Sequence, residues 1–283
     1  MKKSVRVRQF GAGGKKQVFP DDIVIPPGGP RHRSRMHRMK PGETARLSPA
    51  LEARFRRSDT PGPPDQANWI TYAEWMNTGS PITRFLSTWT VPPDPVNEAS
   101  QLLYLFNGMQ TRDGQIIVQP VLQWGDHGAD QDGVNRTGQF WTAACWMVGG
   151  TDANHSLHVR VDPGDILIGA ITLVNETPAG FVYNCEFQGL LDTQFPTGAI
   201  PELAWCVETL EAYELQGNQN PPYDLNNSSE YPRGNVTFSD IAVATNGAGP
   251  TVRWTAHTLV SQYGEDTSII TNSTTSGEIV ISF

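Results

Sequence analysis

Three glutamines recur at four-residue intervals in GQIIVQPVLQWG, residues 114–125: Gln115, Gln119 and Gln123. Because side chains alternate between the two faces of a strand, this spacing places all three amides on one face. The even-numbered residues, from Ile116 to Trp124, take the other face, which is expected to be the core side. Amides can hydrogen-bond a sugar hydroxyl or a developing oxyanion. The row therefore indicates either the wall of a binding groove or an ordinary solvent-facing surface.

Carboxylates form one candidate pair, Glu208 and Glu211, in CVETLEAY. Glycoside hydrolysis requires two carboxyl groups about 5 to 9.5 Å apart across a sugar. An odd spacing puts these two residues on opposite faces of a strand, so they are not expected to share a substrate.

Oxygen-bearing side chains gather in GDHGADQDGVNRTG, residues 125–138, and are of the kind that Ca²⁺ prefers. The loop does not follow the EF-hand order, so a calcium site and a plain acidic turn both remain open. His155 and His158 are three apart, which in a strand places them on opposite faces, and we interpret them as surface histidines. We predict neither a metal site nor a cofactor. The calcium candidates are Asp126, Asp130, Asp132 and Asn135.

The elements that must position these residues are short runs from Trp69 onward, bounded by Pro, Gly, Asn and Asp. Such runs are typical of an antiparallel β-sandwich. Residues 203–215, LAWCVETLEAYEL, could pass for a helix, but their aromatic and β-branched content favours a strand. No apolar run approaches the roughly 20 residues that span a bilayer. Three cysteines are too few for a disulfide framework and are expected to be buried thiols: Cys145, Cys185 and Cys206.

Charge divides the 283-residue chain sharply. Residues 1–57 hold 15 of the 21 Lys and Arg residues and four carboxylates, a net charge of +11; the remainder holds six arginines and 25 carboxylates, or −19. We predict a mostly disordered basic arm over 1–65 and a β-sandwich domain over 66–283. The arm is either a site for an anionic partner, such as a nucleic acid, or a solubilising tail. Because no apolar region follows the charged start MKKSVRVRQF, a conventional signal peptide is not expected, which favours a cytoplasmic or non-classically exported protein.

Several fragments, in order over roughly residues 80–283, resemble the glutamic peptidases (eqolisins), acid endopeptidases built on a concanavalin-like β-sandwich or jelly roll. They are FLSTWTVPP at 85–93, IIVQPV at 116–121, AACWMVGG at 143–150, VDPGDILIGAITL at 161–173 and LAWCVETLE at 203–211. The resemblance implies that Gln119 stabilises an oxyanion and Glu208 acts as general base in the hydrolysis of a polypeptide. Pro120, Val121 and Thr209 depart from the family pattern, and a one-residue shift of the alignment would put Val207 in place of Glu208.

We therefore predict a glutamic-peptidase-like sandwich, with acid endopeptidase activity as the first functional hypothesis. The alternative is a non-catalytic carbohydrate-binding module that uses the same groove. In either case the substrate-binding residues are expected to be Gln115, Gln123, Trp141 and Trp146. The sequence gives no prediction of the oligomeric state.

Overall fold

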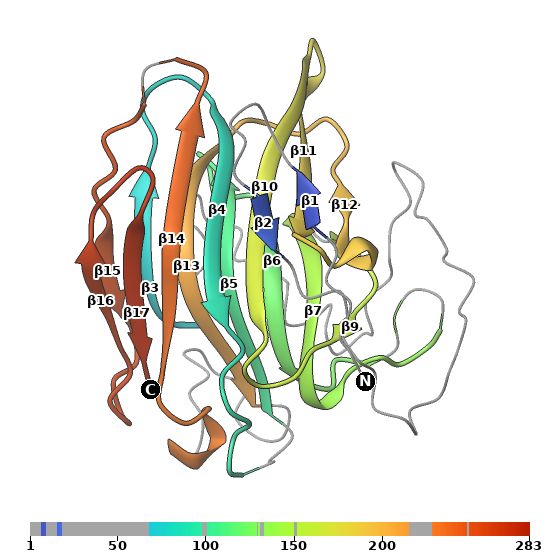
Figure 1. Ribbon diagram of the computed structural model, residues 1–283, viewed down its shortest axis with the longest axis vertical. Coiled ribbons are helices and arrows are strands. Elements are labelled where there is room, and N and C mark those ends of the chain that lie inside the picture. The colour runs from blue at the N-terminus through green and yellow to red at the C-terminus, as the bar shows by residue number, and fades with distance from the viewer. Residues whose placement is uncertain are drawn as a thin grey trace. The chain divides into compact units, whose positions relative to one another are not determined.

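The computed structural model describes residues 68–97, 101–128, 130, 133–149, 152–214, 228–247 and 249–283, together with two short strands near the N-terminus. In this part of the chain the structure is built from strands and two 3-10 turns, η1 (Leu191–Thr193) and η2 (Ser228–Glu230). The strands form two antiparallel sheets that lie face to face (Figure 1). The predicted all-β antiparallel sandwich is thus confirmed, and residues 203–214 form a strand as expected.

One sheet has seven strands in the order β12-β11-β10-β4-β14-β17-β16. The four central strands of this order, β11, β10, β4 and β14, carry alternating apolar residues that pack against the other sheet. The strands are β4 (Ile82–Thr90), β10 (Ile166–Thr177), β11 (Gly180–Phe187), β12 (Phe195–Pro196), β14 (Asn235–Thr245), β16 (Asp266–Thr271) and β17 (Gly277–Ser282).

The other sheet has eight strands in the order β15-β3-β13-β5-β6-β7-β8, and β9 also pairs with β7. Its central strands bring the sequence-predicted residues side by side, because β13 pairs with β5 and β5 with β6. The strands are β3 (Trp69–Met76), β5 (Gln101–Thr111), β6 (Ile116–Gly125), β7 (Gly138–Gly149), β8 (Asp152–His155), β9 (Val159–Arg160), β13 (Leu203–Glu214) and β15 (Thr255–Thr258).

Apolar side chains lie on both faces of the eight-stranded sheet. The face toward the other sheet forms the main core, with Val118, Leu122 and Trp124 of β6 packed among residues of both sheets. The opposite face, which we call the outer face, carries a second buried cluster: Trp69, Tyr72, Leu102, Tyr104, Phe106, Ile117, Val121, Ala144, Trp146, Val148, Ala153, Val207 and Tyr213. An outer face so rich in large apolar side chains is unusual, because one face of an antiparallel sheet is commonly polar and solvated.

The main core also contains the three cysteines, which are buried free thiols as predicted. No helix in the described residues is long and apolar enough to cross a membrane. In the predicted arm, the structure describes one antiparallel pair, β1 (Val7–Gln9) with β2 (Lys16–Val18). The remainder of the arm, and with it the prediction of an anionic partner, lies outside the described residues.

Candidate functional site

Gln119 lies on the outer face, as the alternation of β6 predicts. Its neighbour on β7 is Trp146, and its neighbour on β5 is Gly108. A Cβ atom on Gly108 would lie 3.4 Å from Cβ of Gln119 and 3.2 Å from Cγ2 of Val207. Since Gly108 has no side chain, Val207 of β13 is the residue that faces Gln119 across this strand.

Glu208 lies on the opposite face of the same sheet, in the main core. It pairs with Asn107 of β5 and Ala73 of β3, is fully buried, and accepts a hydrogen bond from the Ser87 hydroxyl of β4 in the facing sheet. Burial raises the pKa of Glu208 well above its ordinary value of 4.5, although the bond from Ser87 opposes this shift. The structure therefore does not bring Gln119 and Glu208 together.

A one-residue irregularity in β13 explains this placement. Leu203 pairs with Thr111, but Trp205 pairs with Gln110, so an additional residue is accommodated at Ala204. A β-bulge of this kind reverses the alternation of every residue that follows it. Leu203 belongs to the main core and so do Cys206 and Leu210, which leaves Glu208 in the core and Val207 on the outer face. Val207, and not Glu208, therefore lies beside Gly108 and faces Gln119.

The four predicted substrate-binding residues do not lie together. Gln115 precedes β6 and is exposed, whereas Gln123 and Trp146 are buried on the outer face. Trp141 was expected on the same face as the glutamines, but it lies in the main core, where its ring meets Trp124 edge to face with 5.4 Å between the ring centroids. Trp141 and Trp146 are five residues apart in one regular strand, so they necessarily face opposite sides.

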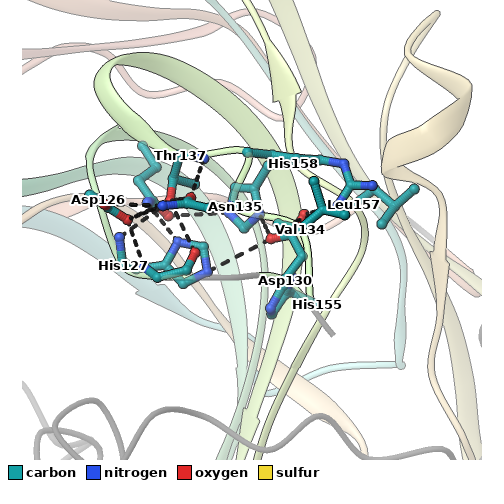
Figure 2. Close-up of polar contacts among 12 residues, drawn as sticks. Asp126, His127, Asp130, Val134, Asn135, Thr137, His155, Leu157 and His158 are labelled. Atoms are coloured by element: carbon teal, nitrogen blue, oxygen red, sulfur yellow. Dashed lines mark hydrogen bonds and ion pairs between the residues drawn. The ribbon is translucent and has the colours of Figure 1, made fainter. Parts of the chain in front are cut away.

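Three buried histidines and an aspartate gather beside Trp146 on the outer face, and Figure 2 shows them around Asp130. His158 Nδ1 lies 2.8 Å from Asp130 Oδ1, and His127 Nε2 lies 3.9 Å from the same oxygen. The His155 ring packs on Trp146 with 4.3 Å between centroids and contacts the ring of His127 at 5.5 Å. The interpretation of His155 and His158 as surface histidines is therefore wrong.

A second bulge brings His155 and His158 to the same side. Trp146 pairs with His155 of β8 and Ala143 pairs with Val159 of β9. Three residues, 156–158, thus face two on β7, so the alternation assumed from the sequence does not hold across this link. The link is fixed by two bonds with Cys145: its amide donates to Ser156 Oγ and its carbonyl accepts from the Ser156 amide, each at 2.9 Å.

The loop between β6 and β7 supplies the remaining members of the cluster. Asp126 accepts hydrogen bonds from the Gly128 amide at 2.8 Å, from Asn135 at 3.0 Å and from Thr137 at 3.2 Å, and so shapes the loop (Figure 2). Asp130 is held instead by His158 and by Arg136, whose Nη1 lies 2.9 Å from Oδ2. Of the calcium candidates, Asp126 and Asn135 therefore bond each other, Asp130 belongs to the histidine cluster, and Asp132 lies outside the described residues.

Electrostatics set the protonation of this cluster. Burial, with the charges of His158 and His155, lowers the pKa of His127 to about 2, and burial lowers the pKa of His155 to about 4. Burial alone would raise the pKa of Asp130, but the hydrogen bond from His158, the two histidine charges and the bond from Arg136 outweigh it and lower that pKa to about 2. At neutral pH the cluster therefore holds neutral imidazoles at 127 and 155 beside an ionised carboxylate.

Comparisons with known proteins give only distant structural likeness. No family model matches the chain, and no curated protein matches it in sequence. Among solved structures, scytalidoglutamic peptidase bound to a peptide-based transition-state analogue has a TM-score of 0.48 at 15% identity, and its complex with a transition-state analogue inhibitor has 0.48 at 14%. SCP-B, a member of the eqolisin family solved with the tripeptide Ala-Ile-His, has 0.45 at 14%. Each comparison covers 77% of this chain and 98% of the other.

Proposed function

We propose that this domain binds an extended polypeptide segment on the outer face of its eight-stranded sheet and does not cleave it with a Gln119–Glu208 dyad. The observation that carries this proposal is the row Gln119, Gly108, Val207 on the outer face, with Glu208 on the other side of the sheet. An aliphatic side chain stands where a dyad would need a carboxylate.

The protonation of Glu208 argues in the same direction. A general base must be ionised at the working pH. Burial raises the pKa of Glu208 well above 4.5, which favours the protonated carboxyl and opposes this role. It is also fully buried against Ser87, away from any substrate on the outer face.

Hydrogen-bonding atoms on the outer face match a polypeptide backbone. Four of them are buried without a partner in the part of the chain that the structure describes: Gln119 Oε1, Thr142 Oγ1, Trp146 Nε1 and Thr209 Oγ1. An unsatisfied buried polar group costs about 1–3 kcal/mol, so such groups call for an explanation. The amide oxygen accepts, the indole donates and the hydroxyls do both, which suits the alternating N–H and C=O groups of an extended chain.

Ring geometry favours a polypeptide over the carbohydrate alternative. Sugars are held against flat, accessible aromatic faces. Here Trp69 meets Tyr72 at 68° and Tyr104 meets Tyr213 at 79°, both edge to face, and one face of Trp146 is covered by His155. These rings pack edge to face on one another and do not present the flat faces that a sugar needs. The net charge of −19 over residues 58–283 would in addition attract basic segments.

Binding can be measured by fluorescence anisotropy with labelled 12-residue peptides. One peptide alternates Val and Lys, a second alternates Ser and Glu, and a labelled oligosaccharide serves as the third probe. We expect the Val/Lys peptide to bind and Gln119→Ala to weaken it about five- to tenfold, corresponding to the loss of one hydrogen bond. Gln115→Ala is the matched control, because it removes the same amide from an exposed position outside the strand.

Cleavage of an unfolded protein between about pH 2 and 7 distinguishes binding from hydrolysis. We expect no cleavage by the folded wild-type protein. Acid-dependent cleavage that disappears in both Glu208→Gln and Gln119→Ala would overturn the proposal and restore the dyad. Binding of the oligosaccharide alone would instead support the carbohydrate-binding alternative.

A further inference from the structure

The histidine cluster takes no part in the proposed binding of a polypeptide, and its geometry suits another ligand. His127, Asp130 and His155 each offer one ligand atom, and these atoms all lie within 4.8 Å of one another. All three residues are buried, at 7%, 3% and 4% exposure. We propose that His127, Asp130 and His155 form a binding site for a divalent transition-metal ion of the zinc class.

The donor set selects the class of metal. Two imidazole nitrogens and one carboxylate oxygen are typical of zinc and of neighbouring transition metals. Calcium and magnesium prefer sets made of oxygen, which this cluster does not supply. Zinc bonds of about 2.0–2.2 Å place the ligand atoms of a tetrahedral ion roughly 3.3 Å apart. A contraction from 4.8 Å therefore requires movements of about an ångström when an ion binds.

His155 has the tautomer that a metal ligand needs. Its Nδ1 lies 2.7 Å from the Ser156 carbonyl oxygen, which can only accept, so Nδ1 carries the proton and Nε2 the lone pair. A second ring nitrogen bonded to a backbone carbonyl is the usual arrangement around a metal-bound histidine, because it fixes the ring and raises its basicity.

Gln123 plays the corresponding part for His127. Its Nε2 lies 3.0 Å from His127 Nδ1, while its Oε1 lies 3.3 Å from His158 Nε2. Gln123 Nε2 also donates to the Gly125 carbonyl oxygen at 3.0 Å, so binding of an ion requires a half-turn of the amide that gives up this bond: Oε1 then accepts from His127 Nδ1–H, which leaves the lone pair of His127 on Nε2. Nε2 of Gln123 donates to His158, and His158 still donates from Nδ1 to Asp130. His127 Nε2, the atom so prepared, is buried without a hydrogen-bond partner among the described residues.

Asp130 is oriented by the groups that surround it. Arg136 holds Oδ2 at 2.9 Å, and His158 contacts Oδ1 at 2.8 Å, so the carboxylate cannot rotate away from His127. Arg136 is a positively charged group that faces the site and opposes a cation. Three protein ligands leave a fourth position for water or another small ligand.

The test is calorimetric titration of the metal-stripped full chain with ZnCl₂ at pH 7.5, with Co²⁺ absorption as a second readout of tetrahedral coordination. We expect one ion per chain and a loss of affinity of at least tenfold in His127→Gln and in His155→Gln. His257→Gln is the matched control, because His257 of β15 lies 3.0 Å from Glu74 of β3, outside the cluster, so the affinity of this variant for Zn²⁺ should equal that of the wild type.

Each outcome decides the proposal. Absence of Zn²⁺ binding to the folded wild type, or equal binding by all three variants, would overturn it. Circular dichroism establishes that each variant is folded. If a glutamine variant does not fold, ¹⁵N-histidine spectra of the wild type provide the same decision, since Zn²⁺ should shift Nε2 of His127 and His155 and leave His257 unchanged.

Discussion

The Glu208→Gln variant should change how the stability of the protein depends on pH. Glu208 is buried in the main core against Ser87, and burial raises the pKa of its carboxyl well above 4.5. The folded protein therefore keeps this proton at pH values where the unfolded chain releases it. The stabilising effect is fully present below pH 4.5 and is lost as pH rises through the folded-state pKa. Glutamine has the same shape as the protonated acid and does not titrate, so the variant should lack this loss.

The magnitude follows from proton linkage. One proton held by the folded state and not by the unfolded state lowers the free energy of unfolding by about 1.4 kcal/mol for each pH unit above the unfolded value. Other groups titrate as well, so the informative quantity is the difference between the variant and the wild type. Above pH 4.5 we therefore expect Glu208→Gln to gain stability relative to the wild type, by up to about 1.4 kcal/mol for each pH unit until the carboxyl of the folded protein ionises. At pH 4 the two proteins should be nearly equal in stability.

Urea unfolding followed by tryptophan fluorescence, at half-unit pH steps from 4 to 8, measures this difference. Glu176→Gln is the control, because Glu176 is an exposed glutamate of β10. A difference that stays constant with pH would refute the reasoning, since it would mean that Glu208 is ionised in the folded protein. A lower free energy of unfolding in the variant than in the wild type at every pH would show that the carboxyl makes interactions that an amide cannot replace.

Three further predictions concern packing and acid stability. Gly169→Ala should destabilise the protein by about 3 kcal/mol or more, because its Cβ would lie 2.3 Å from Asn107 Oδ1 and 2.7 Å from Pro120 Cγ between the sheets; a fall in the urea midpoint checks this. Gly108→Ala on the outer face should cost only about 1 kcal/mol, since its nearest contacts are at 3.2 Å, and an equal cost for the two variants would contradict the calculated spacing. Burial lowers the pKa of His155 to about 4, so the folded protein does not take up the proton that the unfolded chain binds below about pH 6.5. The free energy of unfolding should therefore fall by up to about 3 kcal/mol as pH falls from 6.5 to 4. Glutamine does not titrate, so His155→Gln should be less sensitive to acid in the same urea series.

The general architecture was accessible from the sequence because it follows from alternation. The strand at 116–125 has Val118, Leu122 and Trp124 in the main core and Gln119 and Gln123 on the outer face, as its two-residue period predicts. The same pattern in other runs predicted a sandwich, and the two sheets confirm it. The order of strands within each sheet was not accessible, because it depends on contacts between distant segments that no local pattern encodes.

The errors at the candidate site have a common physical cause. A count of alternate residues from Leu203, a core residue, places Glu208 on the outer face, and the bulge at Ala204 reverses that count. A count from His155 places His158 on the opposite face, and the additional residue in 156–158 reverses it again. The position of each bulge depends on how its strand pairs with a neighbouring strand, so neither bulge can be predicted from the local sequence alone.

These two bulges also separate two chemistries on one sheet. The first turns a carboxylate away from the outer face and buries it in the main core against Ser87, where burial raises its pKa. The second adds His158 to the outer face, where its bond to Asp130 fixes a carboxylate that is ionised. If the first bulge were absent, pairing continued from Leu203 and Thr111 would place Cys206 opposite Gly108 and Glu208 on the outer face, opposite Phe106. Val207→Glu places a carboxylate beside Gly108, across from Gln119, so acid-dependent cleavage by this variant, and not by the wild type, would show that this part of the outer face lacks only a carboxylate to become catalytic.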